Sequence, residues 1–168
     1  MEMDYELSLT DLIDIKILQK IQDCFAGLTG FSVIITDEKG DAITEGSDFS
    51  AFCKDCIRTY GVQNTYCRTC KKAGEGVEMK EKPVNRPCPA GLVNYTAPVK
   101  ANGKLLGYFV AGQLLTAPSD PDKVRKMAVE VGRDPEAYVA LAQNMKIWSC
   151  EEVERDVRFL HTFSDAFS

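Results

Sequence analysis

The sequence predicts an α+β fold in which an antiparallel sheet is flanked by helices and interrupted by a cysteine-rich helical insertion. Apolar residues recur at helical spacing over residues 10–30, segments typical of β-hairpins follow at 31–46 and 92–115, and helical patterns return over 120–168. Five of the seven cysteines fall in the insertion at 49–91. Strands enclosed between groups of helices favour a layer of sheet with helices packed against it.

The first helix is predicted from its apolar spacing and its end signals. Apolar side chains recur every three or four positions; they are Ile13, Ile17, Ile21, Phe25 and Leu28. Ser8 and Asp11 form a start that resembles a capping box, and Gly30 is a stop signal.

Two hairpins are predicted between the helices. The first joins short strands at 31–36 and 41–44, and the second joins longer strands at 92–99 and 105–115 through a turn that contains Asn-Gly. The 105–115 strand is apolar on both faces, which is typical of a central strand covered on both sides. We therefore expect a sheet of at least four strands.

Helices are predicted again towards the end of the sequence, over 121–131, 135–144 and 150–167. The last helix carries an apolar stripe formed by Val153, Val157, Leu160 and Phe167, with Phe159 and Phe163 beside it. This stripe either pairs with a second copy of the chain or packs on the chain's own sheet.

Composition excludes several classes of protein. The 168 residues include 20 Lys and Arg and 25 Asp and Glu, and a net charge of −5 argues against direct nucleic-acid binding by this segment. No apolar run approaches the roughly 20 residues of a membrane helix, and the acidic start is unlike a signal peptide. We expect one cytoplasmic domain over residues 1–168, without membrane contact.

Catalytic motifs are absent from the sequence. The single histidine, His161, excludes a histidine-rich metal centre and leaves only one candidate for a histidine-based triad. The nearest glycine cluster, at 74–78, lacks the Lys-Ser/Thr of a phosphate-binding loop. We expect a protein that is not an enzyme.

The cysteines carry the strongest local signal. Cys53 and Cys56 form one C-x-x-C pair, Cys67 and Cys70 form a second pair after ten intervening residues, and Cys88 follows in a proline-rich loop. Two such pairs suit a tetrahedral thiolate site, so we expect four of the five to hold Zn²⁺ or an iron–sulfur cluster. A redox-active dithiol and simple core packing are the alternatives.

The two remaining cysteines, Cys24 and Cys150, are predicted to be structural. Cys24 lies close to the apolar stripe of the first helix, and Cys150 lies at the start of the last one.

The ordered motifs resemble the PocR ligand-binding domain, a sensory module related to PAS and GAF domains. The resemblance rests on segments 12–30, 33–40, 50–53, 88–92 and 106–113, together with Cys67, Cys70, Ala97, Pro98 and residues 149–154. It implies a sensor for a small polyol or alcohol such as a propanediol or glycerol, upstream of an AraC-type helix-turn-helix or a histidine kinase.

The resemblance also bears on the cysteines. It fits best with Cys53, Cys67 and Cys88 as the core set and with Cys56 and Cys70 as variable partners. The family commonly has His after the third of these, where this chain has Pro89, so any role of that His is absent here. A site closed by four thiolates has no open position, so we expect a structural metal that fixes the 49–91 insertion as a lid over the ligand.

A sensor of this type needs polar groups within otherwise apolar strands. The candidates are Ser32, Thr36, Asn94, Tyr95, Thr96, Tyr108 and Gln113. Strand alternation places Asn94 and Thr96 on one face and Tyr95 on the other, so the candidates cannot all line one pocket. Each of them has the alternative of a structural hydrogen bond within the chain.

The expected output is a homodimer that signals through the last helix. A thiol-redox or iron–sulfur redox sensor and a zinc-ribbon-like interaction module remain alternatives.

Overall fold

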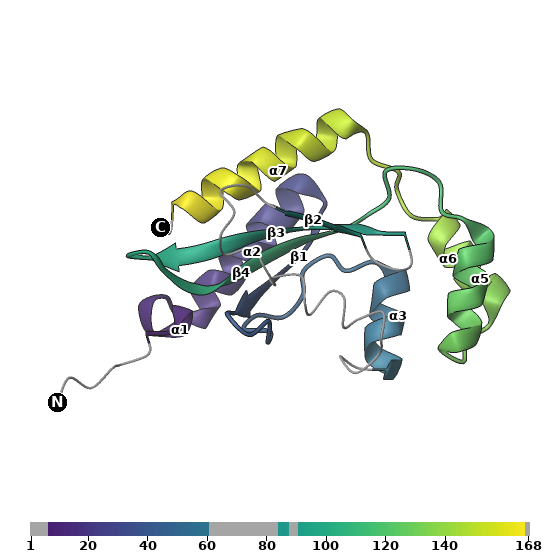
Figure 1. Cartoon of the computed structure of the whole chain (residues 1–168), viewed down its shortest axis with the longest axis horizontal. Coiled ribbons are helices and arrows are strands. Elements are labelled where there is room, and N and C mark those ends of the chain that lie inside the picture. Colours follow the sequence, from purple (N-terminus) through teal and green to yellow (C-terminus); the bar gives the residue numbers. More distant parts are fainter. Residues whose placement is uncertain (1–6, 61–83, 88–90, 167–168) are drawn as a thin grey trace.

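The computed structural model describes residues 7–60, 84–87 and 91–166, with backbone only for 56–60 and 84–87. The helices are α1 (Leu9–Leu12), α2 (Ile15–Thr29), α3 (Ala51–Tyr60), α5 (Pro121–Glu130), α6 (Pro135–Gln143) and α7 (Cys150–Asp165). The strands are β1 (Ser32–Asp37), β2 (Val84–Pro87), β3 (Val93–Ala101) and β4 (Lys104–Leu114) (Figure 1). Within these ranges, no helix combines the length and the apolar character that crossing a membrane requires.

The four strands form one antiparallel sheet in the order β1-β4-β3-β2. The predicted α+β class and the long second hairpin are confirmed. Its turn places Asn102 and Gly103 at φ values of 50° and 77°, the left-handed pair that a tight hairpin requires. Strand β4 lies between β1 and β3, which explains why its sequence is apolar on both faces.

The first predicted hairpin is wrong in its second strand. The chain does turn back along β1, through the isolated bridges Thr36–Ala42 and Val33–Ser47 and a backbone bond from Ile43 N to Ile35 O at 2.9 Å, but residues 41–44 form no regular strand. A regular ladder is interrupted because the backbone N–H of Ile35 donates to two side chains, Gln22 Oε1 and Thr44 Oγ1, each at 3.0 Å. The buried Gln22 of α2 therefore fastens this return segment to the edge of the sheet.

The single helix predicted over 10–30 is divided into α1 and α2. Ile13 is extended, and the side chain of Asp14 then caps α2 by accepting from the N–H of Lys16 at 2.7 Å. The end signals are confirmed: Ser8 and Asp11 form a capping box on α1, and Gly30 ends α2 with φ of 77°.

The buried face of α2 differs from the predicted stripe. It consists of Leu18, Gln22, Phe25, Ala26 and Thr29, whereas Ile17 and Leu28 are 53% and 80% exposed. Spacing alone cannot decide between these faces, because apolar residues at 17, 21, 24 and 28 run beside the seam at 18, 22, 25 and 29 at the same three- and four-residue intervals. Cys24 lies on the outer stripe and is exposed, so its assignment to the core is wrong.

Helices α2 and α7 cover one face of the sheet and enclose the main core (Figure 1). From the strands this core takes Val33, Ile35, Ala97, Val99, Phe109 and Ala111, and from the helices Leu18, Phe25, Val153 and Leu160. The Phe25 and Phe159 rings stack at 5.3 Å and join the two helices.

The apolar stripe of α7 packs on the chain's own sheet. Val153 and Leu160 are buried, Val157 packs against the same core, and the Phe163 ring meets Phe109 edge-on at 4.9 Å. Of the two alternatives for this stripe, its described residues follow the second, packing on the chain's own sheet, and their contacts are not available to a second copy. Phe167 lies outside the described residues.

A second, smaller core lies beyond one end of the strands, where α3 meets the α5–α6 pair (Figure 1). Its members are Phe52, Leu92, Leu115, Val124, Met127, Ala128, Tyr138, Val139 and Ala142. Asp120 and Asp134 cap α5 and α6, each followed by a proline in the first turn, as the sequence predicts.

Two glycines provide a matched test of this packing. A Cβ on Gly107 would lie 2.1 Å from the carbonyl oxygen of Thr36, so Gly107→Ala should separate β1 from β4 and lower the free energy of unfolding by at least 1–3 kcal/mol, a rough range for overpacking. A Cβ on Gly27 of α2 meets nothing within 4 Å, so Gly27→Ala should raise it by about 0.5–1 kcal/mol. Urea unfolding of both variants measures these changes; equal stability of Gly107→Ala and the wild type would contradict the β1–β4 register.

Candidate functional site

The face of the sheet opposite α2 and α7 is the candidate site, because it is polar and yet buried. Residues paired across an antiparallel sheet share a face, and two rows on this face are Ser32–Gly112–Asn94 and Thr36–Tyr108–Pro98. The row between them is Ile34–Val110–Thr96. The polar members Ser32, Thr36, Asn94, Thr96 and Tyr108 are all no more than 7% exposed. Five of the seven candidates from the sequence thus lie together.

Tyr95 lies on the other face, as strand alternation predicts. It packs against the main core, and burial raises the pKa of its hydroxyl, with further contributions from Cys150 and Glu154 of α7. Tyr95 therefore does not join the other candidates.

Gln113 is the hydrogen-bonding centre at one end of the polar face. Its Oε1 accepts from Ser32 Oγ at 3.2 Å, from the backbone N–H of Ser50 at 3.0 Å and from Ser50 Oγ at 3.1 Å. Its own backbone N–H donates to Asn94 Oδ1 at 3.0 Å. Through its side chain and its backbone N–H together, Gln113 thus connects β1, β3, β4 and the segment that leads into α3.

A β-bulge positions Gln113 for these contacts. Val93 pairs with Leu114 and Asn94 with Gly112, so Gln113 is the extra residue on β4, and its φ of 58° lies in the left-handed region. At Gly112 a Cβ would come within 2.6 Å of the Asn94 backbone, so only glycine allows the close approach of β3 and β4 here. The left-handed conformation of Gln113 is strained in a residue other than glycine and persists because the surrounding hydrogen bonds hold it.

Cys53 lies next to this centre, at the start of α3. Ser50 caps α3: its Oγ accepts from the N–H of Cys53 at 3.2 Å, and its carbonyl accepts from the N–H of Lys54 at 2.9 Å. Cys53 is half-buried against the second core. The cysteine helix is therefore fastened to the polar face through Ser50 and Gln113.

The structure describes only part of the predicted metal-binding set beyond Cys53. Cys56 follows Cys53 by one helical turn of α3, and only its backbone is described. Cys67, Cys70 and Cys88 lie outside the described residues. In the described ranges, no three His, Cys, Asp or Glu side chains gather as a metal-binding group. Cys150 is an exposed residue in the first turn of α7.

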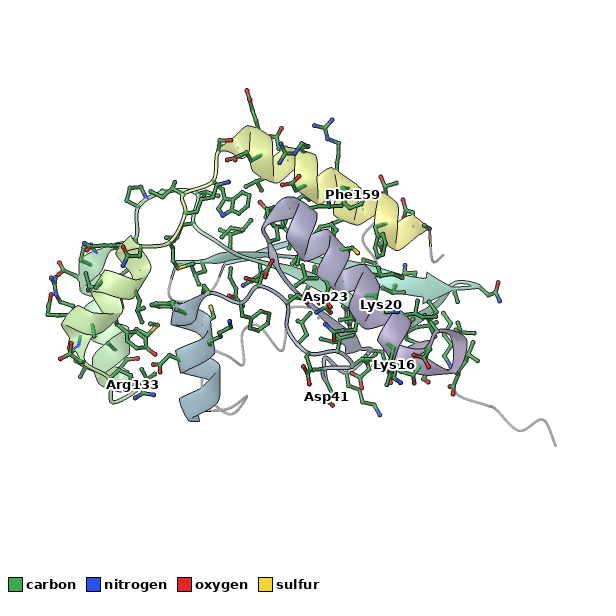
Figure 2. The ribbon with its side chains drawn as sticks, turned by 180° about the vertical axis from the view of Figure 1, so that it is seen from behind. Lys16, Lys20, Asp23, Asp41, Arg133 and Phe159 are labelled. Carbon is green, nitrogen blue, oxygen red and sulfur yellow. The ribbon has the colours of Figure 1, made fainter. Side chains whose placement is uncertain are left out.

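Asp55, between the two cysteines of the first pair, connects α3 to the α5–α6 pair. Its carboxylate accepts a hydrogen bond from Tyr138 Oη at 2.7 Å. The guanidinium of Arg133 lies beside it, with Nε 3.2 Å from Oδ2 and Nη2 3.2 Å from Oδ1. Figure 2 shows Arg133 at the end of the α5–α6 pair, on the side of α3. The cysteine helix is thus held at its start by the sheet and further along by the C-terminal helices.

Comparison with known proteins identifies the family. A family model described as "Sensory domain found in PocR" matches residues 11–168. This chain belongs to the PocR sensory-domain family. Over 101 residues it is 32% identical to Regulatory protein PocR of Salmonella typhimurium (strain LT2), an alignment that covers 59% of this chain and 33% of the relative. No solved structure matches the chain.

Sequence reasoning missed two parts of this PocR domain. Asp55 contacts Arg133 and Tyr138, which lie 78 and 83 positions further along the chain, and no local pattern links such distant residues. Ser50 and Gln22 were also missed; the signal for Ser50 was its position three residues before Cys53, which is typical of an N-cap.

Gln113 should be the most sensitive residue of this cluster. Gln113→Ala removes three hydrogen bonds to Oε1 and keeps the unfavourable φ, so we expect a loss of about 1–3 kcal/mol in the free energy of unfolding. Gln113→Gly should recover about 1 kcal/mol of that loss, since glycine adopts positive φ without strain.

Urea unfolding gives both values, and hydrogen exchange at Cys53 and Lys54 should quicken in both variants as the cap on α3 loosens. Greater stability of the alanine variant than of the glycine variant would contradict the strained bulge.

Proposed function

We propose that this PocR domain senses a small neutral molecule with hydroxyl groups, such as a propanediol or glycerol, and that it does so without catalysis. The observation that carries the proposal is the buried polar face of β1, β3 and β4. Burying a hydroxyl or amide lowers stability by about 1–3 kcal/mol unless a hydrogen bond compensates it, and Ser32, Thr36 and Asn94 each make such a bond within the chain. Aliphatic side chains would fill a purely structural face without this requirement, so polar groups gathered on one buried face favour recognition over simple packing.

The chemistry of the face favours neutral ligands. The three rows that begin at Ser32, Ile34 and Thr36 carry hydroxyls, one amide, a phenol and aliphatic groups. None of these described side chains has a formal charge. Hydroxyl groups of a ligand both donate and accept, which matches Ser, Thr, Tyr and Asn side chains. Ile34 and Val110 offer apolar surface to a short carbon chain.

We propose that the domain belongs to a transcriptional regulator or a sensor kinase. The resemblance to Regulatory protein PocR supports this, and the alignment covers only a third of that relative, so a larger protein would contain the output domain. A net charge of −5 is consistent with a segment that senses while another binds DNA.

The contacts of α3 offer a route for the signal. The helix is fastened to the polar face through Ser50 and Gln113 and to the C-terminal helices through Asp55, Arg133 and Tyr138. A ligand that competes for the Ser32 or Asn94 side chains would alter the Gln113 bonds and shift α3 against α5–α6. This coupling is part of the proposal.

Dimerisation also stays a proposal. Because the α7 stripe is occupied, a second copy would have to use other surface. The outer side of α2 exposes Ile17 and Leu28, and Phe159 of α7, stacked on Phe25, is 45% exposed.

We propose further that four of Cys53, Cys56, Cys67, Cys70 and Cys88 hold one Zn²⁺. The helical spacing of the first pair fits two thiolates of a tetrahedral set, and a closed thiolate site is structural, fixing the insertion rather than reacting. Iron bound as a cluster, or a dithiol that cycles with a disulfide, would make this a redox sensor.

Ligand binding is tested by thermal unfolding with propane-1,2-diol, propane-1,3-diol and glycerol. At 100 times Kd a ligand raises stability by about 2.7 kcal/mol, so Tm should rise with concentration. Asn94→Leu should lose most of this rise. Tyr95→Phe, which changes the opposite face, is the matched control and should keep it. The polyol proposal is abandoned if no compound in the panel shifts the wild-type Tm.

The metal is tested by elemental analysis and native mass spectrometry of the purified chain. We expect one zinc per chain, lost in Cys53→Ser and in Cys67→Ser because each removes a thiolate ligand. Cys24→Ser, at an exposed cysteine of α2, should keep the metal. Iron with acid-labile sulfide, or metal-free protein with a reversible disulfide, would replace zinc with the redox alternative.

A further inference from the structure

Among the described residues of the polar face, only Thr96 has a buried hydroxyl without a hydrogen-bond partner. Thr96 is 0% exposed, and in the described structure its Oγ1 makes no hydrogen bond. Most buried polar atoms in folded proteins have a hydrogen-bond partner. An exception on a candidate binding face therefore points to a bound molecule as the partner.

The other polar groups of the face differ from Thr96. Ser32 Oγ donates to the carbonyl of Asp48 at 2.7 Å, Thr36 Oγ1 donates to the carbonyl of Asp37 at 3.1 Å, and Asn94 Oδ1 accepts from the N–H of Gln113 at 3.0 Å. Valine has almost the same shape as threonine, suits a strand equally well and leaves no unpaired hydroxyl. Packing alone therefore gives no reason for threonine at this position.

The neighbours of Thr96 define what it can recognise. Across the sheet its row continues with Val110 and Ile34, both aliphatic. Along β3, Asn94 lies two residues away on the same face, roughly 6.8 Å at about 3.4 Å per residue. A short molecule with two oxygens can reach both polar side chains while its carbon atoms contact the aliphatic row.

We propose that Thr96 is a specificity-determining residue, and that its Oγ1 binds one hydroxyl of a short aliphatic diol whose carbon chain lies on Ile34 and Val110. This inference rests on the proposed function and deepens it by assigning one ligand hydroxyl to a particular residue. A ligand bound at a fully buried side chain is shielded from water, which strengthens each hydrogen bond to it.

The test compares Thr96→Val with the wild type, in the absence and presence of ligand. Without ligand, Thr96→Val should unfold at the same Tm or a higher one, because it removes an unpaired hydroxyl. Thr44→Val is the matched control: Thr44 is also buried, but its Oγ1 accepts from Ile35 N at 3.0 Å, away from the polar face, so its Tm should fall.

Binding is measured by calorimetry with propane-1,2-diol, glycerol and propan-1-ol as probes. Thr96→Val should weaken propane-1,2-diol binding about tenfold, the effect of one lost hydrogen bond of ordinary strength. It should also reduce the preference for this diol over propan-1-ol. Thr96→Ser, which keeps the hydroxyl, should restore most of the affinity, and Thr44→Val should bind as the wild type does.

The failures of the two proposals are distinguishable. If the wild type binds propane-1,2-diol and Thr96→Val binds it equally well, the role of Thr96 is overturned and the proposed function stands. A fall in the Tm of free Thr96→Val as large as that of Thr44→Val overturns it too, because the hydroxyl then has a partner in the chain. If the wild type binds none of the probes, both proposals fail together.

Discussion

The side-chain amide of Gln113 is the interaction on which the arrangement of this domain depends. It holds the bulge of β4 in a strained backbone conformation and accepts hydrogen bonds from Ser32 on β1 and from Ser50 before α3. Without this side chain, the end of the sheet and the cap of the cysteine helix would have no common anchor, while the Asn94 side chain is held by the backbone N–H of the same residue. A strained residue held by several bonds is typical of a functional site.

The two faces of the sheet divide structure from function. From β1 and β3 the main core against α2 and α7 takes odd-numbered residues, among them Val33 and Ala97. From β4 it takes Leu106, Phe109, Ala111 and Leu114, because register shifts interrupt the alternation of that strand. The opposite face carries the buried polar residues Ser32, Thr36, Asn94, Thr96 and Tyr108, together with the partly exposed aliphatic residues Ile34 and Val110. Because side chains alternate along β1 and β3, the residues that form the core and the polar residues proposed to contact a ligand are interleaved in sequence and separate in space.

The helical parts connect to that sheet through a few directed contacts. Asp55 binds Arg133 and Tyr138, so the helix that carries Cys53 and Cys56 is tied to α5 and α6 as well as to the sheet. Sequence analysis detected the cysteines and the three C-terminal helices but not this connection, because an ion pair between distant segments leaves no periodic pattern. The same applies to Gln22, a polar residue in an amphipathic helix whose role appears only beside Ile35 and Thr44.

The sequence alone determined the α+β class, the central hairpin, most of the helix ends and the grouping of polar residues by face, because these depend on periodicity and on caps within a few residues of each other. Tertiary structure decided which of two equally spaced stripes of α2 is buried, and it turned the α7 stripe inward onto Phe109. It also decided that Gln113 bulges out of β4. These outcomes depend on the competition of distant surfaces for the same contacts, which local spacing does not encode.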